Sequence, residues 1–116
     1  LGGSDTLPNE EIKGLTIDET IQVAQKLSEL GVAWIGVSGN HCMYGATLDA
    51  NDTAYFSDYA EAIRSNVDRH VLIDCAGGIR TKEKAEQLLS TNVCDLVGIA
   101  RPLLKDPGYL QKGWNL

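Results

Sequence analysis

Two turns in this sequence have the residue types of an anion-binding site. Gly77 and Gly78 directly follow one apolar run, and Ala100 and Arg101 stand at the end of the next. Glycine lets the backbone approach a ligand closely, and arginine adds a positive charge that binds phosphate well. A helix that begins after each turn would add free N–H groups and the positive end of its dipole. A Gly-Gly pair alone is more often only a tight turn, but the two turns together predict one phosphate site.

Helical patterns alternate with apolar runs along the chain. Thr16 and Glu19 have the spacing of a capping box, and Gly31 supplies a left-handed helix end. The apolar runs lack polar alternation, which is typical of parallel strands that are buried on both faces. We therefore expect an α/β fold in which helices connect parallel strands. The expected helices lie near 16–31, 56–66 and 81–92, with a short one at Pro102, and the expected strands lie at 32–38, 70–76 and 93–100.

Two architectures fit this order of elements: a small open doubly wound sheet, or part of a (β/α)8 barrel. In both, ligands bind at the carboxyl ends of the strands, where the two turns lie. Three strands of a barrel would leave two open edges and an uncovered inner face rich in Val, Ile and Leu. An isolated barrel portion of this kind is expected to self-associate or to be marginally stable.

Charge and cysteine content limit the function classes. The chain has 116 residues and a net charge of -6 with scattered Lys and Arg, which argues against a nucleic-acid-binding module. No apolar stretch has the length of a membrane span. Cys42, Cys75 and Cys94 form an odd set without a C-x-x-C spacing, which favours buried thiols in a reducing, cytoplasmic compartment. Asp74 and Asp95 lie in or beside apolar runs, so each carboxylate needs a partner.

The stretch "LIDCAGGIRTKEKAEQLLSTNVCDLVGIARPLLKDPGY" resembles the C-terminal portion of the old yellow enzyme family of flavin-dependent oxidoreductases. In that family the last two barrel strands lead into Gly-Gly-Ile and into a Gly-Arg-Pro-like turn with Leu-Leu-x-Asp-Pro. The stretch "TIDETIQVAQKLSELGVAWIGVSGN" is similar to the family's fifth helix and sixth strand. The resemblance implies that residues 1–116 are a single partial (β/α)8 (TIM) barrel unit with parallel strands and crossover helices, the C-terminal portion of an FMN oxidoreductase domain.

The resemblance also implies where FMN would bind. The backbone amides of Gly77, Gly78, Ala100 and Arg101 would hold the FMN phosphate, and the Arg101 side chain would lie beside the phosphate or the flavin. Ala100 stands where the family usually has Gly, which crowds the approach of the backbone slightly. The implied activity is that of an ene-reductase-like enzyme. NADH or NADPH would be the reductant, and the substrate would be a small molecule such as an unsaturated carbonyl compound or a similar oxidant.

The long loop after 32–38 would, by the same resemblance, line the substrate mouth. Asn40, His41 and Tyr44 could each offer a hydrogen bond there, although loop residues that face water explain them as well. No metal site is expected, because His41 and Cys42 are adjacent rather than in a ligand spacing. A (β/α)8 barrel needs about 250 residues, and the family's catalytic residues lie on its earlier strands. We therefore expect this chain to hold the flavin-phosphate site, to carry no catalytic residue and to be inactive alone.

Two other functions stay open at the level of sequence. One is a self-standing three-stranded α/β module that binds a phosphorylated ligand without catalysis. The other is a structural or oligomer-forming domain whose glycines only make turns.

Overall fold

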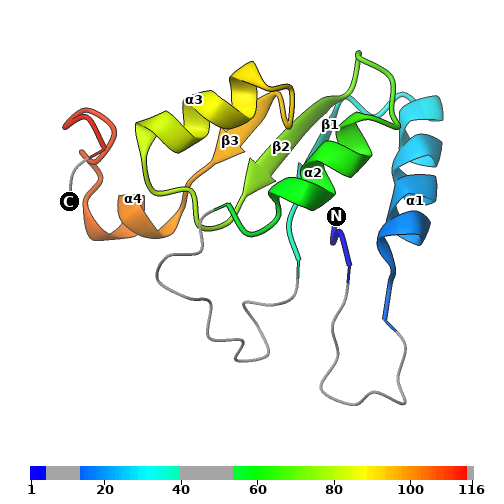
Figure 1. The fold of residues 1–116 in the computed structure, drawn as a ribbon, viewed down its shortest axis with the longest axis horizontal. Helices are drawn as coiled ribbons and strands as arrows, with labels where there is room; N and C mark the ends of the chain where they lie inside the picture. The colour runs from blue at the N-terminus through cyan, green and yellow to red at the C-terminus, as the bar shows by residue number, and fades with distance from the viewer. Residues whose placement is uncertain (5–13, 40–53, 115–116) are drawn as a thin grey trace.

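The computed structural model describes residues 1–4, 14–39 and 54–114. Helices and strands alternate in the expected order, so the α/β class and the crossover helices are confirmed (Figure 1). The strands are shorter than the apolar runs that predicted them. The elements are α1 (Ile17–Glu29), β1 (Trp34–Val37), α2 (Ser57–Arg64), β2 (Leu72–Ala76), α3 (Lys82–Ser90), β3 (Leu96–Gly98) and α4 (Arg101–Lys105).

The three strands form one sheet in the order β1-β2-β3, and both neighbouring pairs are parallel. The expected neighbours and directions are therefore confirmed. The third strand has 3 residues, because only the middle of its apolar run joins the ladder. Val93 and Cys94, before the strand, pack in the hydrophobic core instead. After Gly98 the chain turns away into α4.

A short segment extends the sheet beyond β1, on the side away from β2. Gly2 forms a parallel bridge with Ser38. The nitrogen of Leu1 donates to the carbonyl oxygen of Gly36 at 2.7 Å, and that of Gly3 donates to Ser38 at 2.8 Å. Residues 1–3 thus run parallel to β1 as a further edge of the sheet.

The ends of the helices follow the signals in the sequence. Thr16 and Glu19 form the complete capping box at the start of α1, and Gly31 has a φ of +85° just after its end. The hydroxyl of Thr81 accepts from the N–H of Lys84 at 3.2 Å, and Asn92 closes α3 with a φ of +59°. The capping box helix is 13 residues long. In the described part of the chain, no helix combines the length and the apolar character that crossing a bilayer requires.

The three long helices cover only one face of the sheet. Ile35, Val37, Ile73 and Cys75 share that face, where each is at most 4% exposed and packs in the core with helix residues. On the opposite face, Trp34 is 58% exposed. Burial therefore alternates along β1 and β2. The expectation of strands buried on both faces is wrong for the described residues, because α1, α2 and α3 all pack on the same side.

The uncovered face also differs from the expectation in its composition. The Val and Ile side chains of the strands lie on the covered face, so the uncovered face is not rich in them. An open doubly wound sheet has helices on both faces, whereas a (β/α)8 barrel has its helices in one outer ring. The sheet is therefore built like a section of barrel wall. By the strand register, its uncovered face consists of Trp34, Gly36, Leu72, Asp74, Ala76, Leu96 and Gly98.

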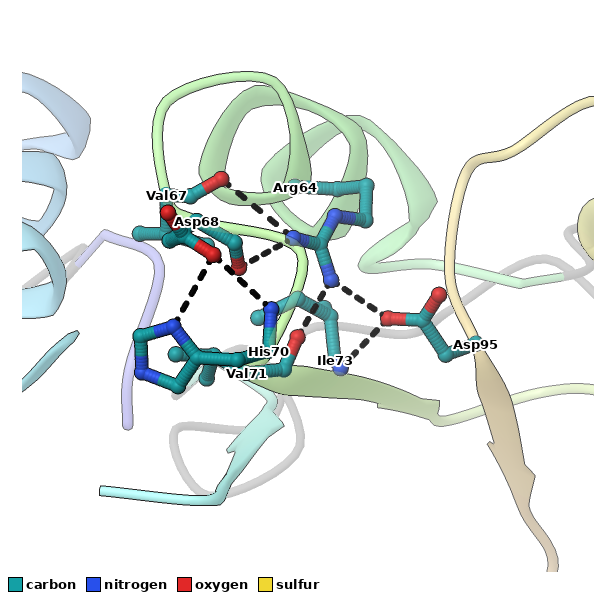
Figure 2. Close-up of polar contacts among 7 residues, drawn as sticks. All are labelled: Arg64, Val67, Asp68, His70, Val71, Ile73 and Asp95. Atoms are coloured by element: carbon teal, nitrogen blue, oxygen red, sulfur yellow. Dashed lines mark hydrogen bonds and ion pairs between the residues drawn. The ribbon is translucent and has the colours of Figure 1, made fainter. Parts of the chain in front are cut away.

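One buried arginine connects α2 to the strands beneath it (Figure 2). The side chain of Arg64 is 2% exposed, and its Nη1 lies 2.5 Å from Oδ2 of Asp95. The guanidinium also donates to three backbone carbonyl oxygens in the connection between α2 and β2, those of Val67, Asp68 and Val71. A buried charge that gains an opposite charge and several acceptors is largely compensated for its lost hydration. The partner that Asp95 was expected to need is thus Arg64.

Asp95 in turn joins β2 to the residues before β3. Its Oδ2 accepts from the N–H of Ile73 at 2.8 Å, and its own N–H donates to the carbonyl oxygen of Ile73 at 2.8 Å. Burial is the strongest influence on the Asp95 carboxyl and raises its pKa. The hydrogen bonds from Ile73 and Arg64 outweigh burial, so the pKa lies below its usual value. The carboxylate is therefore the form that the fold stabilises.

We expect the 116-residue chain by itself to associate through its uncovered sheet face. Trp34 and Leu72 are 58% and 43% exposed there, and apolar surface of this kind is usually covered. Changing both to Lys should lower the apparent mass in sedimentation velocity. Leu30→Lys is the matched control, because Leu30 is 71% exposed at the end of α1, away from this face. A wild-type chain that stays monomeric at all concentrations would contradict the expectation.

We expect Asp95→Asn to lower the free energy of unfolding by about 3 kcal/mol at neutral pH, because it leaves the Arg64 charge buried and unpaired. The folded pKa of Asp95 is lowered, so its contribution is present above the unfolded pKa of about 3.9 and is lost as pH falls through the folded value. The gap between wild type and variant in urea unfolding should therefore shrink in acid.

Glu29→Gln is the control for this experiment. This substitution breaks the ion pair between Glu29 and Lys26, whose side chains are 66% and 69% exposed. Its effect on the free energy of unfolding should therefore be small. A gap between wild type and Asp95→Asn that does not change with pH would exclude the carboxylate as its source.

Candidate anion-binding site

A cavity of about 730 Å³ lies at the carboxyl ends of β2 and β3. Both turns singled out in the sequence contribute to it, and all four residues assigned to the flavin phosphate are among its lining. Parallel pairing explains this, because Ala76 at the end of β2 lies opposite Gly98 at the end of β3. The lining residues are Ala76, Gly77, Gly78, Ile79, Arg80, Gly98, Ile99, Ala100, Arg101, Pro102, Lys105, Tyr109 and Trp114.

The turn after β2 requires glycine for reasons within the protein itself. Gly77 and Gly78 have φ values of +105° and +72°, which other residues rarely adopt. A Cβ on Gly77 would lie 2.7 Å from the ring of Phe56, and one on Gly78 would lie 2.5 Å from the ring of Tyr55. The N–H of Tyr55 also donates to the carbonyl oxygen of Gly77 at 3.1 Å. The aromatic residues before α2 therefore pack directly on the glycine turn.

The turn after β3 brings the short helix α4 to the cavity. Ala100 precedes α4 with φ and ψ of -122° and -67°, and Pro102 occupies the first turn of the helix, as expected. Arg101 is exposed at the cavity. Gly98 permits the close approach of the two strands at this edge, because a Cβ there would lie 2.9 Å from that of Ala76.

Among the described residues, the lining of the cavity has a charge opposite to that of the chain. It includes three cationic residues, Arg80, Arg101 and Lys105, and no described Asp or Glu, although the chain as a whole carries a net charge of -6. Clustered positive charge in a concave site raises the local concentration of anions. The cavity is therefore suited to a negatively charged group.

Sequence reasoning missed several residues of this site. Arg80 lies two residues after the glycine pair, and its place in the turn was a usable signal. Tyr109 had no such signal, because it reaches the cavity only through the fold: it is 2% exposed, and its hydroxyl donates to the carbonyl oxygen of Arg80 at 2.7 Å. Its ring lies 6.0 Å from that of Trp114. These two aromatic residues come from the segment after α4 and close one wall of the cavity.

Some expected contributors do not reach the cavity or cannot be placed. Thr81 and Lys82, at the start of α3, are not among the lining residues, so the dipole of that helix is less directly involved than expected. The candidate substrate-mouth residues Asn40, His41 and Tyr44 lie outside the described residues, as does Cys42. The described cysteines, Cys75 and Cys94, are buried free thiols, as the sequence predicted. The described residues contain no cluster of side chains that could hold a metal ion.

Asp74 lies two residues before Ala76, on the same uncovered face of the sheet. It is paired in register with Leu96, and its Oδ1 is buried without a hydrogen-bond partner in the described part of the chain. A carboxylate oxygen in this position is costly unless a donor approaches it. The uncovered face is therefore suited to contact with a segment that carries a donor.

Comparison with known proteins identifies relatives of one kind. No family model matches the chain. A bilirubin reductase of Mediterraneibacter gnavus is 36% identical over 109 residues, which cover 85% of this chain and 16% of that protein. An NADPH dehydrogenase of Bacillus velezensis is 34% identical over 100 residues, or 84% of this chain and 28% of the relative. An NADH:flavin oxidoreductase of Gibberella zeae is 32% identical over 98 residues, which cover 83% of this chain and 23% of that protein.

The three relatives come from two bacteria and a fungus, and each match extends over more than four fifths of this chain. The chain spans between 16% and 28% of the length of these relatives. Its parallel strands, with helices on one side, agree with the TIM-barrel fold of the family to which the relatives belong. The chain belongs to the old yellow enzyme family, of whose barrel it is a part.

Proposed function

We propose that this chain is the flavin-phosphate-binding, C-terminal portion of an FMN-dependent NAD(P)H oxidoreductase. The observation that carries the proposal is the cavity at the ends of β2 and β3, where Gly77, Gly78, Ala100 and Arg101 meet. Sites for phosphate in (β/α)8 barrels are often built from the loops after the last two strands. In this proposal β1, β2 and β3 are the sixth, seventh and eighth barrel strands.

The residues present fit the phosphate end of FMN. The cavity volume of about 730 Å³ lies within the range of sites for small molecules and cofactors. Arg101 and Lys105 provide charge for a dianion, and the backbone at Gly78 carries no side chain of its own. Ala100 adds only a methyl group where the family usually has glycine. These residues would bind and orient the phosphate, and the flavin would supply the transfer of hydride.

The whole protein would use NADH or NADPH to reduce a small molecule. The names of the relatives include an NADPH dehydrogenase, an NADH:flavin oxidoreductase and a bilirubin reductase. An unsaturated carbonyl compound or a similar oxidant fits this range of names. We assign no catalytic residue within residues 1–116, so the substrate-activating groups would come from the remaining strands of the barrel. The 116-residue chain alone would then be inactive, and a cytoplasmic location stays a prediction.

We expect the full-length protein that contains this chain to copurify with FMN. Released flavin should coelute with FMN rather than with FAD or riboflavin in liquid chromatography. Addition of NADH or NADPH without oxygen should bleach its visible absorbance, because the bound flavin accepts the hydride. A protein that carries no flavin and binds none would contradict the proposed function and favour the self-standing phosphate-binding module.

We expect Arg101→Ala to weaken FMN binding by about tenfold or more, because a charged hydrogen-bond donor to phosphate contributes roughly 1.5 to 3 kcal/mol. Affinity for riboflavin, which lacks the phosphate, should change little. Binding to the apoprotein can be measured by quenching of flavin fluorescence.

Arg69→Ala is the matched control, because Arg69 is exposed in the connection before β2, at the opposite end of the strands. Gly78 is a poor site for this test. Its positive φ and the ring of Tyr55 would make any larger residue strain the turn itself. Equal loss of FMN and riboflavin affinity in Arg101→Ala would show that Arg101 does not contact the phosphate.

A further inference from the structure

The turn between β2 and α3 is held from two sides by tyrosine hydroxyls. Nη2 of Arg80 donates to the hydroxyl oxygen of Tyr55 at 2.6 Å, and the Arg80 guanidinium carbon lies 5.7 Å from the centre of the Tyr55 ring. On the other side, the hydroxyl of Tyr109 donates to the carbonyl oxygen of Arg80 at 2.7 Å. Tyr55 comes from the segment before α2, and Tyr109 from the segment after α4. Arg80 therefore links three parts of the chain at the cavity.

We propose that Tyr55 and Tyr109 are positioning residues of the anion site, which act by fixing the turn from Gly77 to Arg80. The proposal rests on the proposed function, since it assumes that the anion is the phosphate of FMN. Neither tyrosine was singled out by sequence, and neither needs to touch the phosphate. Their role is to hold one wall of the cavity at a constant distance from the other.

The turn needs such support because of its own residues. Gly77 and Gly78 both have positive φ, and glycine has more conformational freedom than any other residue. Two successive glycines would therefore let the turn move. An anion that binds to a mobile turn must order its amides, and this loss of entropy weakens binding. The Tyr55 ring packs against Gly78, at a distance that would leave a Cβ only 2.5 Å away. Contact with a rigid ring restricts the turn on that side.

The bond from Tyr109 has the further effect of joining the two walls. One wall is the turn that contains Arg80, and the other is β3, α4 and the segment that follows. The Tyr109 ring is 2% exposed and lies beside that of Trp114, so the position of its hydroxyl is well defined. Its hydrogen bond to Arg80 therefore sets the distance between the glycine turn and the turn at Ala100.

The test is the ratio of FMN to riboflavin affinity in the full-length apoprotein. Tyr109→Phe keeps the buried ring and removes only the hydroxyl. We expect FMN binding to weaken about five- to tenfold, because binding must then order the turn that the hydroxyl holds in the wild type, and riboflavin binding to stay unchanged. Tyr55→Phe should lower the ratio in the same direction. A purely structural role would instead lower both affinities together.

Tyr59→Phe is the matched control. Tyr59 lies in α2, stacked on Phe56, and it is not among the residues that line the cavity. Its ratio should equal that of the wild type. If the wild type prefers FMN, and Tyr55→Phe and Tyr109→Phe show the same preference, the positioning role is wrong but the proposed phosphate site still stands. A wild type without preference for FMN would instead refute the proposed function, and the positioning role with it.

Discussion

The register between β2 and β3 determines the geometry of the cavity. It is fixed at the amino ends of the strands by Asp95, whose N–H and carboxylate both bond to the backbone of Ile73. Arg64 supports this arrangement by pairing with the Asp95 charge. Burial raises the pKa of the carboxyl, but the hydrogen bond from Ile73 and the contact with Arg64 together hold it below its usual value. The same register places Ala76 opposite Gly98 at the other end of the strands. The turns that follow must then begin side by side, which is the condition for a shared anion site.

Helices on a single face explain where the core of this chain lies and why the other face of the sheet is exposed. The β-branched side chains of the strands lie on the covered face, and the two described cysteines pack against them. The core of the chain therefore lies between the sheet and the helices. The uncovered face has Trp34 and Leu72 exposed and a carboxylate oxygen of Asp74 without a partner in the described residues. Apolar surface and an unpaired oxygen together favour contact with further chain. That agrees with a TIM-barrel relationship in which the chain spans less than a third of each relative.

Local signals in the sequence predicted the elements well, and contacts between distant residues were not predictable. The capping box of Thr16, the stop at Gly31 and the position of Pro102 act within a few residues, so the sequence alone located three helix ends. The apolar runs correctly indicated parallel strands. They could not tell which face would be covered, because a run without polar alternation fits burial on one side or on both. Arg64 gave no signal either, since its acceptors lie up to 31 residues away.

The glycine pair shows that a residue pattern can have a structural cause that the sequence does not reveal. The sequence suggested that Gly77 and Gly78 lack side chains so that a ligand can approach. In the structure, both glycines are already required by positive φ and by the rings of Phe56 and Tyr55. Glycine content is therefore weak support for an anion at this turn. Stronger support comes from the described lining of the cavity, which includes three cations and no carboxylate in a chain of net charge -6, because clustered positive charge in a concave site raises the local concentration of anions.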